Sequence, residues 1–397
     1  MNIGLVIESL DPARGGAEQW TSQFAQWLLA AGHEVHVVAA HVASHLERLG
    51  LVVHPIEAGR SRTAFAQAAE LKLDKLSLDV IHDMGSGWHC DVFQPHGGSR
   101  RAAFEQNLLL APAWTRPIKR RTAAWLPRYR DFQQLVDRQY RADDRLFVAL
   151  SRMVADDFVR YHHLQPDQVR LVYNGVDLAR YSPDHRPAYR QAVRERLAVR
   201  DDELLLVVVA HNFRLKGVPT LLAAAGRLAA DAAPVRVAVV GGKRLPRQHA
   251  AGGITSFIGP VDDASPYYAA ADVYVQPTYY DPCSLVLLEA LASGLPVVTS
   301  RFNGAGELLT PGVEGWLVDD PGDAAELAGR LRPLLDPAVR SAMGVAARKL
   351  ALEHSFERNC REILAVYREI AERRRRASAT KGPHKWGHYE PNRLAPS

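Results

Sequence analysis

Apolar residues recur along this chain in short continuous runs, and each run is followed by a turn and a longer stretch with helical apolar spacing. The first unit begins with the strand pattern NIGLVIES over residues 2–9. The helix pattern GAEQWTSQFAQWLLAAG follows over residues 16–32, where Gly32 closes it, and HEVHVVAA over residues 33–40 is the next strand pattern. Continuous apolar strands alternating with amphipathic helices are typical of a parallel sheet covered on both faces. The pattern therefore predicts an α/β protein.

The same unit recurs in both halves of the chain. The first half also contains the strand patterns LVVHPI, DVIHD, DVFQ, RLFVAL and QVRLVY. A polar, proline-containing stretch over residues 174–199 interrupts the pattern, and we interpret it as a linker. The pattern restarts with ELLLVVVA and continues with VRVAVVGG, TSFIG, DVYVQP, LPVVTS and EGWLV. Two doubly wound domains facing across a cleft are expected, with ligands at the carboxyl ends of the strands.

We place the N-terminal domain at residues 1–174 and the C-terminal domain at residues 175–356. A C-terminal helix over residues 357–373 is predicted to pack back on the N-terminal domain. The composition then changes to RRRRASATKGPHKWGHYEPNRLAPS without periodicity, so a basic disordered tail is expected over residues 374–397.

Length and composition agree with this division. A chain of 397 residues exceeds one ordinary domain, and 47% hydrophobic with 23% charged residues is typical of a packed globular protein. The three cysteines are odd in number and far apart, so their spacing indicates neither a disulfide framework nor a zinc site. The first residues, MNIGLVIESL, do not read as a secretion signal, and no stretch reaches 18 uncharged apolar residues. A cytoplasmic location is the expectation.

Positive charge is concentrated in one segment of the first half. The net charge is +5, yet residues 102–130 contain only one acid, Glu105, against six basic residues. These basic residues lie among aromatic ones: Arg116, Lys119, Arg120, Arg121, Arg128 and Arg130 with Trp114, Trp125 and Tyr129. Such a mixture suits an anionic bilayer surface. A polynucleotide would use similar residues, but no nucleic-acid fold signature accompanies them. A solvated basic loop is the other interpretation.

The stretch DPCSLVLLEALASG predicts an anion site at a helix start. Pro282 and Ser284 suit the first positions of a helix that Gly294 ends. The free backbone N–H groups around Cys283, Ser284 and Leu285 would then suit a phosphate group.

Glu289 lies further along the same helix among leucines and alanines, where an unpaired carboxylate is costly. Its partner is either a pair of ligand hydroxyls or a basic side chain of the protein. The spacing alone leaves both open.

Other candidate residues follow predicted strands. Arg214 and Lys216 come directly after a buried strand, where two cations suit a pyrophosphate, although solvated loop charges would look the same. Gly15 and Gly16 occupy the first strand-to-helix turn and allow close approach of a substrate. His96 follows a strand and precedes two glycines, a place that a structural histidine would also suit.

Together these pieces resemble retaining glycosyltransferases of the GT-B fold, in the group that contains sucrose synthase-like, mannosyl- and lipopolysaccharide-core transferases. The resemblance covers residues 1–372. It is carried by the glycine pair, LVYNGVDLARYSP at the domain junction, NFRLKG, and an acid-x7-acid motif that ends in EALASGLPVV. The last motif is the most specific.

The resemblance implies a site for a nucleotide-diphosphate sugar in the C-terminal domain. Glu289 would bind the ribose hydroxyls, and Asp281 would lie near the hydroxyls of the donor sugar. The N–H groups of residues 283–285 would cap the diphosphate, while Arg214 and Lys216 would neutralise it on leaving. No metal and no cofactor is then expected.

The resemblance also assigns two further places. The segment of residues 257–261, which includes Gly259, would frame the base. His96 would lie on the acceptor side, close to the reacting carbon. Retention in such enzymes is commonly explained by front-face attack, with the leaving phosphate helping to remove the acceptor proton.

Two departures from the family pattern lie in the same stretch. The family usually has Glu where Asp281 stands, so this carboxylate is one methylene shorter. The small glycine-rich triplet that usually follows is replaced by Pro282, Cys283 and Ser284.

A closer resemblance concerns the acceptor. The basic segment followed by DRQYRADDRLFVALSRMVADDFVRYHHLQPDQVRLVYNGVD looks like the lipopolysaccharide-core glucosyltransferases that add glucose to an inner-core heptose. It implies UDP-glucose as donor, a lipid-linked saccharide as acceptor, and peripheral association of residues 114–130 with the inner face of the cell membrane. A GDP-mannose transferase, a non-catalytic sugar- or membrane-binding relative, and an epimerase of the same architecture are the alternatives.

Overall fold

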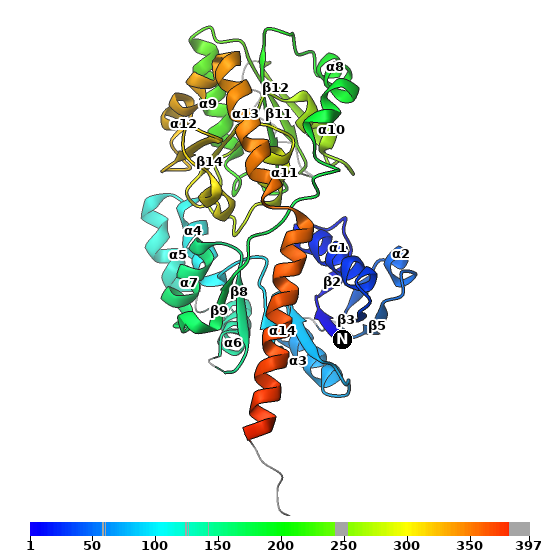
Figure 1. Ribbon diagram of the computed structural model, residues 1–397. Helices are drawn as coiled ribbons and strands as arrows, with labels where there is room; N and C mark the ends of the chain where they lie inside the picture. Colours follow the sequence, from blue (N-terminus) through cyan, green and yellow to red (C-terminus); the bar gives the residue numbers. More distant parts are fainter. Residues whose placement is uncertain are drawn as a thin grey trace, which may run out of the picture.

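The computed structural model describes residues 1–57, 59, 61–123, 125, 127–141, 143–242 and 253–380. It consists of two α/β domains, with the N-terminal domain below and the C-terminal domain above in Figure 1. Each domain is built on one large parallel sheet with helices on both faces, as the alternation of apolar strands and amphipathic helices predicts.

The sheet of the N-terminal domain has seven strands. Their order is β5 (Val52–Pro55), β3 (Glu34–Ala39), β1 (Asn2–Val6), β6 (Val80–Asp83), β7 (Val92–Phe93), β8 (Leu146–Ala149) and β9 (Val169–Leu171). A small separate pair is formed by β2 (Ser9–Leu10) and β4 (His41–Val42). The order reverses between β1 and β6, and a ligand crevice is expected at the carboxyl ends of such neighbours.

The sheet of the C-terminal domain has six strands with the same reversal. Their order is β12 (Thr255–Gly259), β11 (Val235–Val240), β10 (Leu204–Val209), β13 (Val273–Gln276), β14 (Val297–Ser300) and β15 (Gly315–Val318). The order reverses between β10 and β13. The loop that holds Lys216 follows β10, and the loop that holds Asp281 follows β13, so both candidate segments leave the sheet at this point.

Helices cover the two sheets. In the N-terminal domain they are α1 (Gly16–Ala30), α2 (Ser44–Glu47), α3 (Arg62–Leu73), α4 (Arg100–Leu109), α5 (Arg116–Ala123), α6 (Pro127–Gln139) and α7 (Arg152–His162). In the second half they are α8 (Arg186–Arg196), α9 (Val218–Ala230), α10 (Ser265–Ala270), α11 (Leu285–Ala292), α12 (Ala324–Leu331), α13 (Pro337–Leu352) and α14 (Phe356–Thr380).

Helix α14 returns from the C-terminal domain and runs along the N-terminal domain (Figure 1). Its apolar face is part of that domain's core, where Ile363 and Tyr367 are fully buried in one cluster with Trp20 and Phe24. The chain crosses between the domains twice at one place. The Val176 N–H donates to the carbonyl of His354 at 3.0 Å, and the Phe356 N–H donates back to Val176 at 2.9 Å.

The structure corrects two expectations about organisation. The stretch at residues 174–199 is not a plain linker, because it contains helix α8, which packs against α10. Residues 374–380, which we had assigned to the tail, continue helix α14. The remainder of the predicted tail, residues 381–397, lies outside the described residues.

Two further findings concern the cysteines and the membrane. Cys90, Cys283 and Cys360 are free thiols. Among the described residues, no helix has the length and apolar character that crossing a bilayer requires.

Candidate active site

The carboxylate of Glu289 lies in helix α11 with 8% of the residue exposed. The Tyr268 hydroxyl donates to its Oε2 at 2.8 Å. Burial raises the pKa of Glu289, while the hydroxyls of Tyr268 and Tyr181 and the charge of Arg180 act in the opposite direction. The direct partner of this carboxylate is therefore a tyrosine hydroxyl. Among the described residues, no Lys or Arg side chain forms an ion pair with it.

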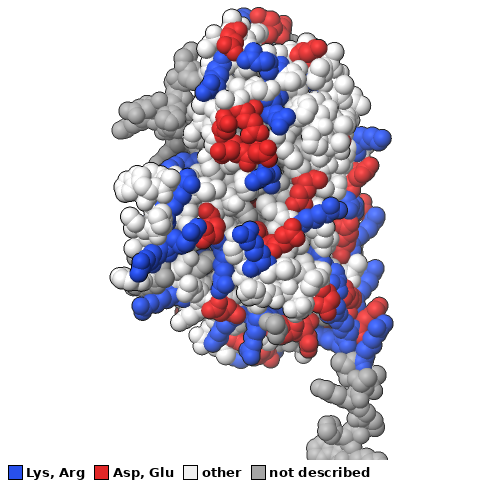
Figure 2. Space-filling view, turned by 90° about the vertical axis from the view of Figure 1, so that its left-hand side faces the viewer, with Lys and Arg blue, Asp and Glu red and all other residues white. Residues whose placement is uncertain are grey.

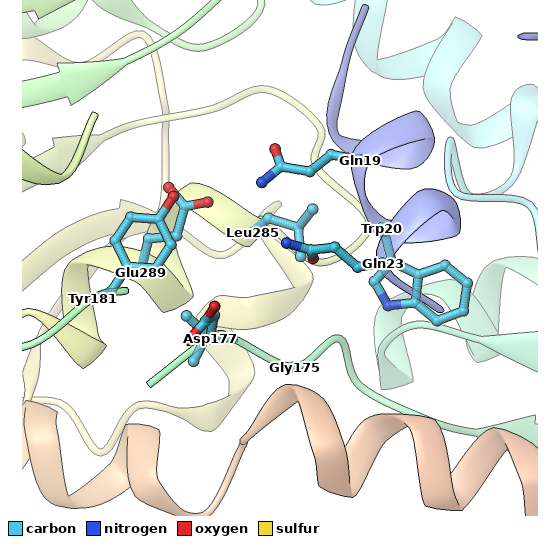
Figure 3. Close-up of a pocket in the computed structure, with 9 residues that line it drawn as sticks. Gln19, Trp20, Gln23, Gly175, Asp177, Tyr181, Leu285 and Glu289 are labelled. Carbon is cyan, nitrogen blue, oxygen red and sulfur yellow. The ribbon is translucent and has the colours of Figure 1, made fainter. Parts of the chain in front are cut away.

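Glu289 forms part of a pocket between the two domains. The pocket opens to solvent. Figure 3 shows its walls: the carboxylate of Glu289 and the ring of Tyr181 on one side, and side chains of helix α1 on the other. Its lining residues are Gln19, Trp20, Gln23, Gly175, Val176, Asp177, Tyr181, Leu285 and Glu289. The site thus requires both domains and the junction between them.

Two helix N-termini meet at this pocket. Helix α1 begins at Gly16 with Gly15 before it, and helix α11 begins at Leu285 with Ser284 before it. A Cβ on Gly16 would lie 3.1 Å from Cδ1 of Leu285, so the two helix starts approach each other closely at Gly16. Backbone N–H groups and helix dipoles from two sides suit an anionic group.

The segment before α11 is held in place by side chains. The Ser284 hydroxyl donates to Oε1 of Gln276 at 3.0 Å, and Nδ2 of Asn174 donates to the carbonyl of Cys283 at 2.8 Å. Oδ1 of Asn303 lies 3.4 Å from the Ser284 nitrogen. Because Asn174 belongs to the domain junction, this contact ties the helix start to the other side of the pocket.

Lys216 and Asp281 form an ion pair with 2.5 Å between Nζ and Oδ2. Both are mostly covered, with 22% and 11% of their side chains exposed. Gly217, which has φ of 74°, enables this approach, because a Cβ there would lie 2.0 Å from the carbonyl oxygen of Pro277. The structure therefore brings together two of the predicted residues.

Arg214 points elsewhere. It is exposed, and its guanidinium donates across the cleft to the carbonyl of Leu110, at the end of helix α4, at 2.9 Å. A role at a diphosphate would require the side chain to leave this contact.

His96 faces helix α1 from the loop after β7. Its ring lies 4.8 Å from the ring of Trp20, which also lines the pocket, and burial lowers the pKa of His96 to about 4. The histidine is thus neutral at pH 7. Gly98, with φ of 65°, lets this loop approach the C-terminal domain, since a Cβ there would lie 2.8 Å from Cγ of Pro282.

Gly259 is not among the residues that line this pocket. It ends strand β12 with φ of 83°, and its carbonyl accepts the N–H of Gly241 at 2.7 Å. Phe257 packs near Phe213 with 6.1 Å between ring centroids, and Val261 lines a separate pocket. The expected framing of a base by residues 257–261 stays a prediction.

Three large apolar side chains of the predicted membrane segment are exposed. Trp114 and Trp125 have 75% and 76% of their surface exposed, and Ile118 has 57%. Tyr129 instead packs between Phe104 and Phe132, with centroids 5.3 and 5.4 Å away. The side chain of Arg128 lies outside the described part of the chain.

Charges on this surface are mixed rather than uniformly basic. Arg120 pairs with Glu105, and Arg101 pairs with Asp137 at 3.0 Å. Figure 2 shows blue basic side chains projecting from the lower half of this face with acidic ones between them. Lys119 and Arg121 in helix α5 are also exposed.

Metal ligands do not gather at the site. In the part of the chain that the structure describes, no cluster of three or more His, Cys, Asp or Glu side chains is arranged to hold a metal ion.

Two family models match the chain, one in each half. The model described as Glycosyltransferase Family 4 matches residues 14–180, and the model described as Glycosyl transferases group 1 matches residues 203–337. A curated relative, D-inositol 3-phosphate glycosyltransferase 2 of Catenulispora acidiphila, is 34% identical over 267 residues. This match covers 60% of each chain, so the protein spans about 60% of the length of that relative.

Solved structures agree with the fold. WaaG, a glycosyltransferase involved in lipopolysaccharide biosynthesis, has a TM-score of 0.76 at 19% identity, over 91% of this chain and 98% of its own. HepE of Anabaena, in complex with UDP-glucose, has a TM-score of 0.69 at 18% identity, over 95% and 100%. The chain has the GT-B fold, and its two halves match the models of group 1 and family 4 glycosyltransferases. The predicted fold class and the broad resemblance are confirmed, and the narrower likeness to lipopolysaccharide-core glucosyltransferases stays a prediction.

Proposed function

We propose that this protein is a glycosyltransferase that transfers a hexose, with UDP-glucose as the proposed donor, onto an anionic or lipid-linked saccharide acceptor. The observation that carries the proposal is the buried carboxylate of Glu289 in a pocket where two helix N-termini meet. A carboxylate that accepts a hydrogen bond from a tyrosine hydroxyl can also accept hydrogen bonds from the hydroxyls of a ribose. The nearby N–H groups suit the attached diphosphate.

The residues proposed to bind the nucleotide sugar have different roles according to their charge. Glu289 binds the ribose, and the N–H groups at Gly16 and at the start of α11 hold the diphosphate. Lys216 turns from its ion pair toward the phosphate oxygens as negative charge develops on them, and Arg214 adds a second cation after leaving the Leu110 carbonyl. These groups supply the charge stabilisation that a bound metal supplies in other transferases, so the proposed reaction is metal-independent.

Asp281 then accepts a hydrogen bond from a hydroxyl of the donor sugar. It is well placed for this because it lies in a mostly covered site, with 11% of its side chain exposed. The hexose is transferred with retention of configuration. The acceptor oxygen bonds to the anomeric carbon on the same face from which the phosphate departs, as the bond between that carbon and the phosphate oxygen breaks. The acceptor proton passes to a phosphate oxygen. Neutral His96 accepts a hydrogen bond from another hydroxyl of the acceptor and so orients the acceptor.

Two acceptor classes are supported by different observations. The exposed Trp114, Trp125, Lys119 and Arg121 favour a lipid-linked saccharide, reached at the inner face of the cell membrane by a peripherally bound protein. The name of the curated relative, D-inositol 3-phosphate glycosyltransferase 2, favours a small phosphorylated polyol. Hexose transfer is common to both. A GDP-mannose donor and a non-catalytic role are the remaining alternatives.

Isothermal titration with UDP-glucose, UDP-galactose, UDP-N-acetylglucosamine and GDP-mannose tests the donor. We expect one donor to bind, and Glu289→Gln to weaken it at least about 10-fold, because a ribose hydroxyl loses a charged acceptor. Glu353→Gln, on an exposed position after helix α13, serves as the matched control. Binding of a donor that Glu289→Gln leaves unchanged would refute the assigned site. Absence of binding to all four would move the weight to the non-catalytic alternative.

A further inference from the structure

Buried polar side chains without partners gather beside His96. His82 in strand β6 and Gln94 after strand β7 are fully buried. The Nε2 atom of His82, both amide atoms of Gln94 and the Nε2 atom of His96 have no hydrogen-bond partner among the described residues. Each unpaired buried group costs about 1–3 kcal/mol, so four such atoms in one region call for an explanation.

The far side of His82 is bound to helix α14. The hydroxyl oxygen of Tyr367 lies 2.6 Å from Nδ1 of His82, and neither residue is exposed. Burial raises the pKa of Tyr367 and lowers the pKa of His82 to about 3, so both are neutral at pH 7. The tyrosine proton needs an acceptor, and Nδ1 of His82 is the atom in reach. His82 therefore carries its own proton on Nε2.

Gln94 can connect this proton to His96. Its amide lies beside His82 and raises the pKa of His82, in opposition to the effect of burial. His96 is also close enough to lower this pKa. An amide oxygen has two lone pairs. A rotated Gln94 side chain would allow Oε1 to accept both the Nε2–H of His82 and the Nε2–H of His96. His96 then has its lone pair on Nδ1.

Helix α14 reaches His96 by a second route. Nε1 of Trp20 donates to Oδ1 of Asn359 at 2.8 Å, and Nδ2 of Asn359 donates to the carbonyl of Tyr173 at 2.7 Å. The indole is thereby fixed, and it packs against the ring of His96. Asn359 and Tyr367 lie two helical turns apart on the same helix and both face the N-terminal domain.

We propose that helix α14 is a positioning element of the active site. Tyr367 acts through His82 and Gln94, Asn359 acts through Trp20, and together they fix the tautomer and the orientation of His96. The role of His96 in transfer rests on the proposed function, whereas the arrangement of its ring does not. The C-terminal helix would then contribute to chemistry that takes place in the cleft.

Histidine ring nitrogen-15 NMR on the full chain tests the proposal without any substrate. The signals are assigned by their loss in His96→Asn and His82→Asn. We expect Tyr367→Phe to shift the ring signals of both His82 and His96. Tyr267→Phe is the matched control, because it removes a hydroxyl bonded to Arg196 at 2.9 Å from a buried tyrosine outside the site, and both signals should stay in place. A His96 signal that Tyr367→Phe leaves unmoved overturns the proposal.

A second variant breaks the middle of the chain of contacts. Gln94→Met should move the signals of His96 while the contact between His82 and Tyr367 persists. If it leaves His96 unmoved, Gln94 does not connect the rings and the proposal fails. This variant also serves if Tyr367→Phe does not fold, which the thermal midpoint reports.

Kinetics separate positioning from the proposed function. With an active wild type, Tyr367→Phe should lower kcat about 10-fold and leave KM for the donor unchanged, since the donor residues are untouched. Asn359→Leu should act likewise, and Asn359→Asp, which keeps an acceptor for Trp20, should restore most of the rate. An equal loss in both Asn359 variants contradicts the second route. If the wild-type protein is inactive with every donor, only the proposed function is refuted. The NMR experiment still tests the arrangement of the His96 ring, because it uses no substrate.

Discussion

The carboxylate of Glu307, in the C-terminal domain, caps the first turn of helix α7 in the N-terminal domain, where it accepts the backbone N–H of Arg152 at 2.8 Å. Its other oxygen, Oε1, accepts the N–H of Met153 at 2.7 Å, and the Tyr173 hydroxyl donates at 3.0 Å to Oε2, the oxygen that also accepts from Arg152. Helix caps usually come from the helix's own chain neighbour. Helix α7 has such a cap, because the Ser151 hydroxyl accepts the N–H of Val154 at 3.2 Å. Glu307 adds a second cap from the other domain, so the contact also links the two domains.

Removing this cap should loosen the domain arrangement. We expect Glu307→Ala to cost about 1–2 kcal/mol of unfolding free energy, the usual effect of losing a cap, and to increase the radius of gyration in small-angle X-ray scattering. Asp323→Ala is the matched control, because Asp323 caps helix α12 within one domain. It should cost a similar free energy and leave the radius unchanged. Equal radii for Glu307→Ala and the wild type would show that the cap does not hold the domains.

A second contact between the domains titrates. The Tyr280 hydroxyl donates to Oδ2 of Asp157 in helix α7 at 3.0 Å, and it accepts the N–H of Ser99. Burial raises the pKa of Asp157 to about 6, and Asp156 acts in the same direction, while the Tyr280 hydroxyl and the charge of Arg160 oppose it. A raised pKa means that the folded state binds this proton more tightly than the unfolded state does.

Stability from Asp157 is therefore present at low pH and is lost as the pH rises through about 6. Asp157→Asn keeps an acceptor for Tyr280 and removes the titration. We expect it to raise the unfolding free energy at pH 7.5 by about 1 kcal/mol, less than the full shift because the group is partly screened by solvent, and to add little at pH 4.5. Asp83, whose pKa burial also raises to about 6, adds a slope of the same sign to both proteins. Chemical denaturation of both proteins across this range measures the difference, and a constant difference would refute the assignment.

The pair of Lys216 and Asp281 makes a separable prediction. Lys216→Met removes the cation that we propose for the leaving diphosphate and should lower kcat by about 10²–10³-fold. It also leaves the mostly covered Asp281 without its partner, which should cost about 1–3 kcal/mol of stability. Adding Asp281→Asn should restore stability without restoring the rate. Recovery of activity in the double variant would mean that Lys216 serves only to neutralise Asp281, and Lys349→Met, on an exposed position, is the control.

The sequence predicts the sheets and the start of helix α11 because these depend on local patterns. Strands buried on both faces read as apolar runs, and Pro282, Ser284 and Gly294 mark the ends of α11 within a few residues. Helix α8 escaped detection for the opposite reason. Its buried Arg194 bonds to Asp272 at 3.0 Å, and a partner 78 residues away leaves no local signal.

Residues of the site could likewise be predicted only where their signal is local in the sequence. The charge of Glu289 in an apolar helix is visible in the sequence, so its importance could be predicted. Its partner Tyr268 could not, because a tyrosine in the run YYAAAD is indistinguishable from an ordinary core residue. The direction of Arg214 is set by a backbone carbonyl of the other domain, at Leu110, and only the assembled fold contains that relationship.

The proposed membrane contact around helix α5 depends on exposed basic side chains and on exposed aromatic side chains. Their contributions to binding can be measured separately. We expect the protein to sediment with vesicles that contain phosphatidylglycerol at low salt, and to lose this binding when Lys119 and Arg121 are both changed to Glu. Each basic residue near an anionic surface contributes about 1 kcal/mol, so reversing two charges should lower the partition coefficient by at least about 30-fold. Lys349→Glu with Arg227→Glu changes net charge equally on the other domain and should leave binding intact.

Trp114→Ala tests the apolar part. The indole is 75% exposed, so its removal should not affect folding, yet it should weaken binding to vesicles at high salt, where attraction between charges is screened and apolar insertion remains. Retained binding in the charge-reversed protein together with loss in Trp114→Ala would assign the contact to aromatic insertion alone. No sedimentation of the wild type with anionic vesicles would remove the membrane surface from the proposed function. It would favour the small phosphorylated acceptor.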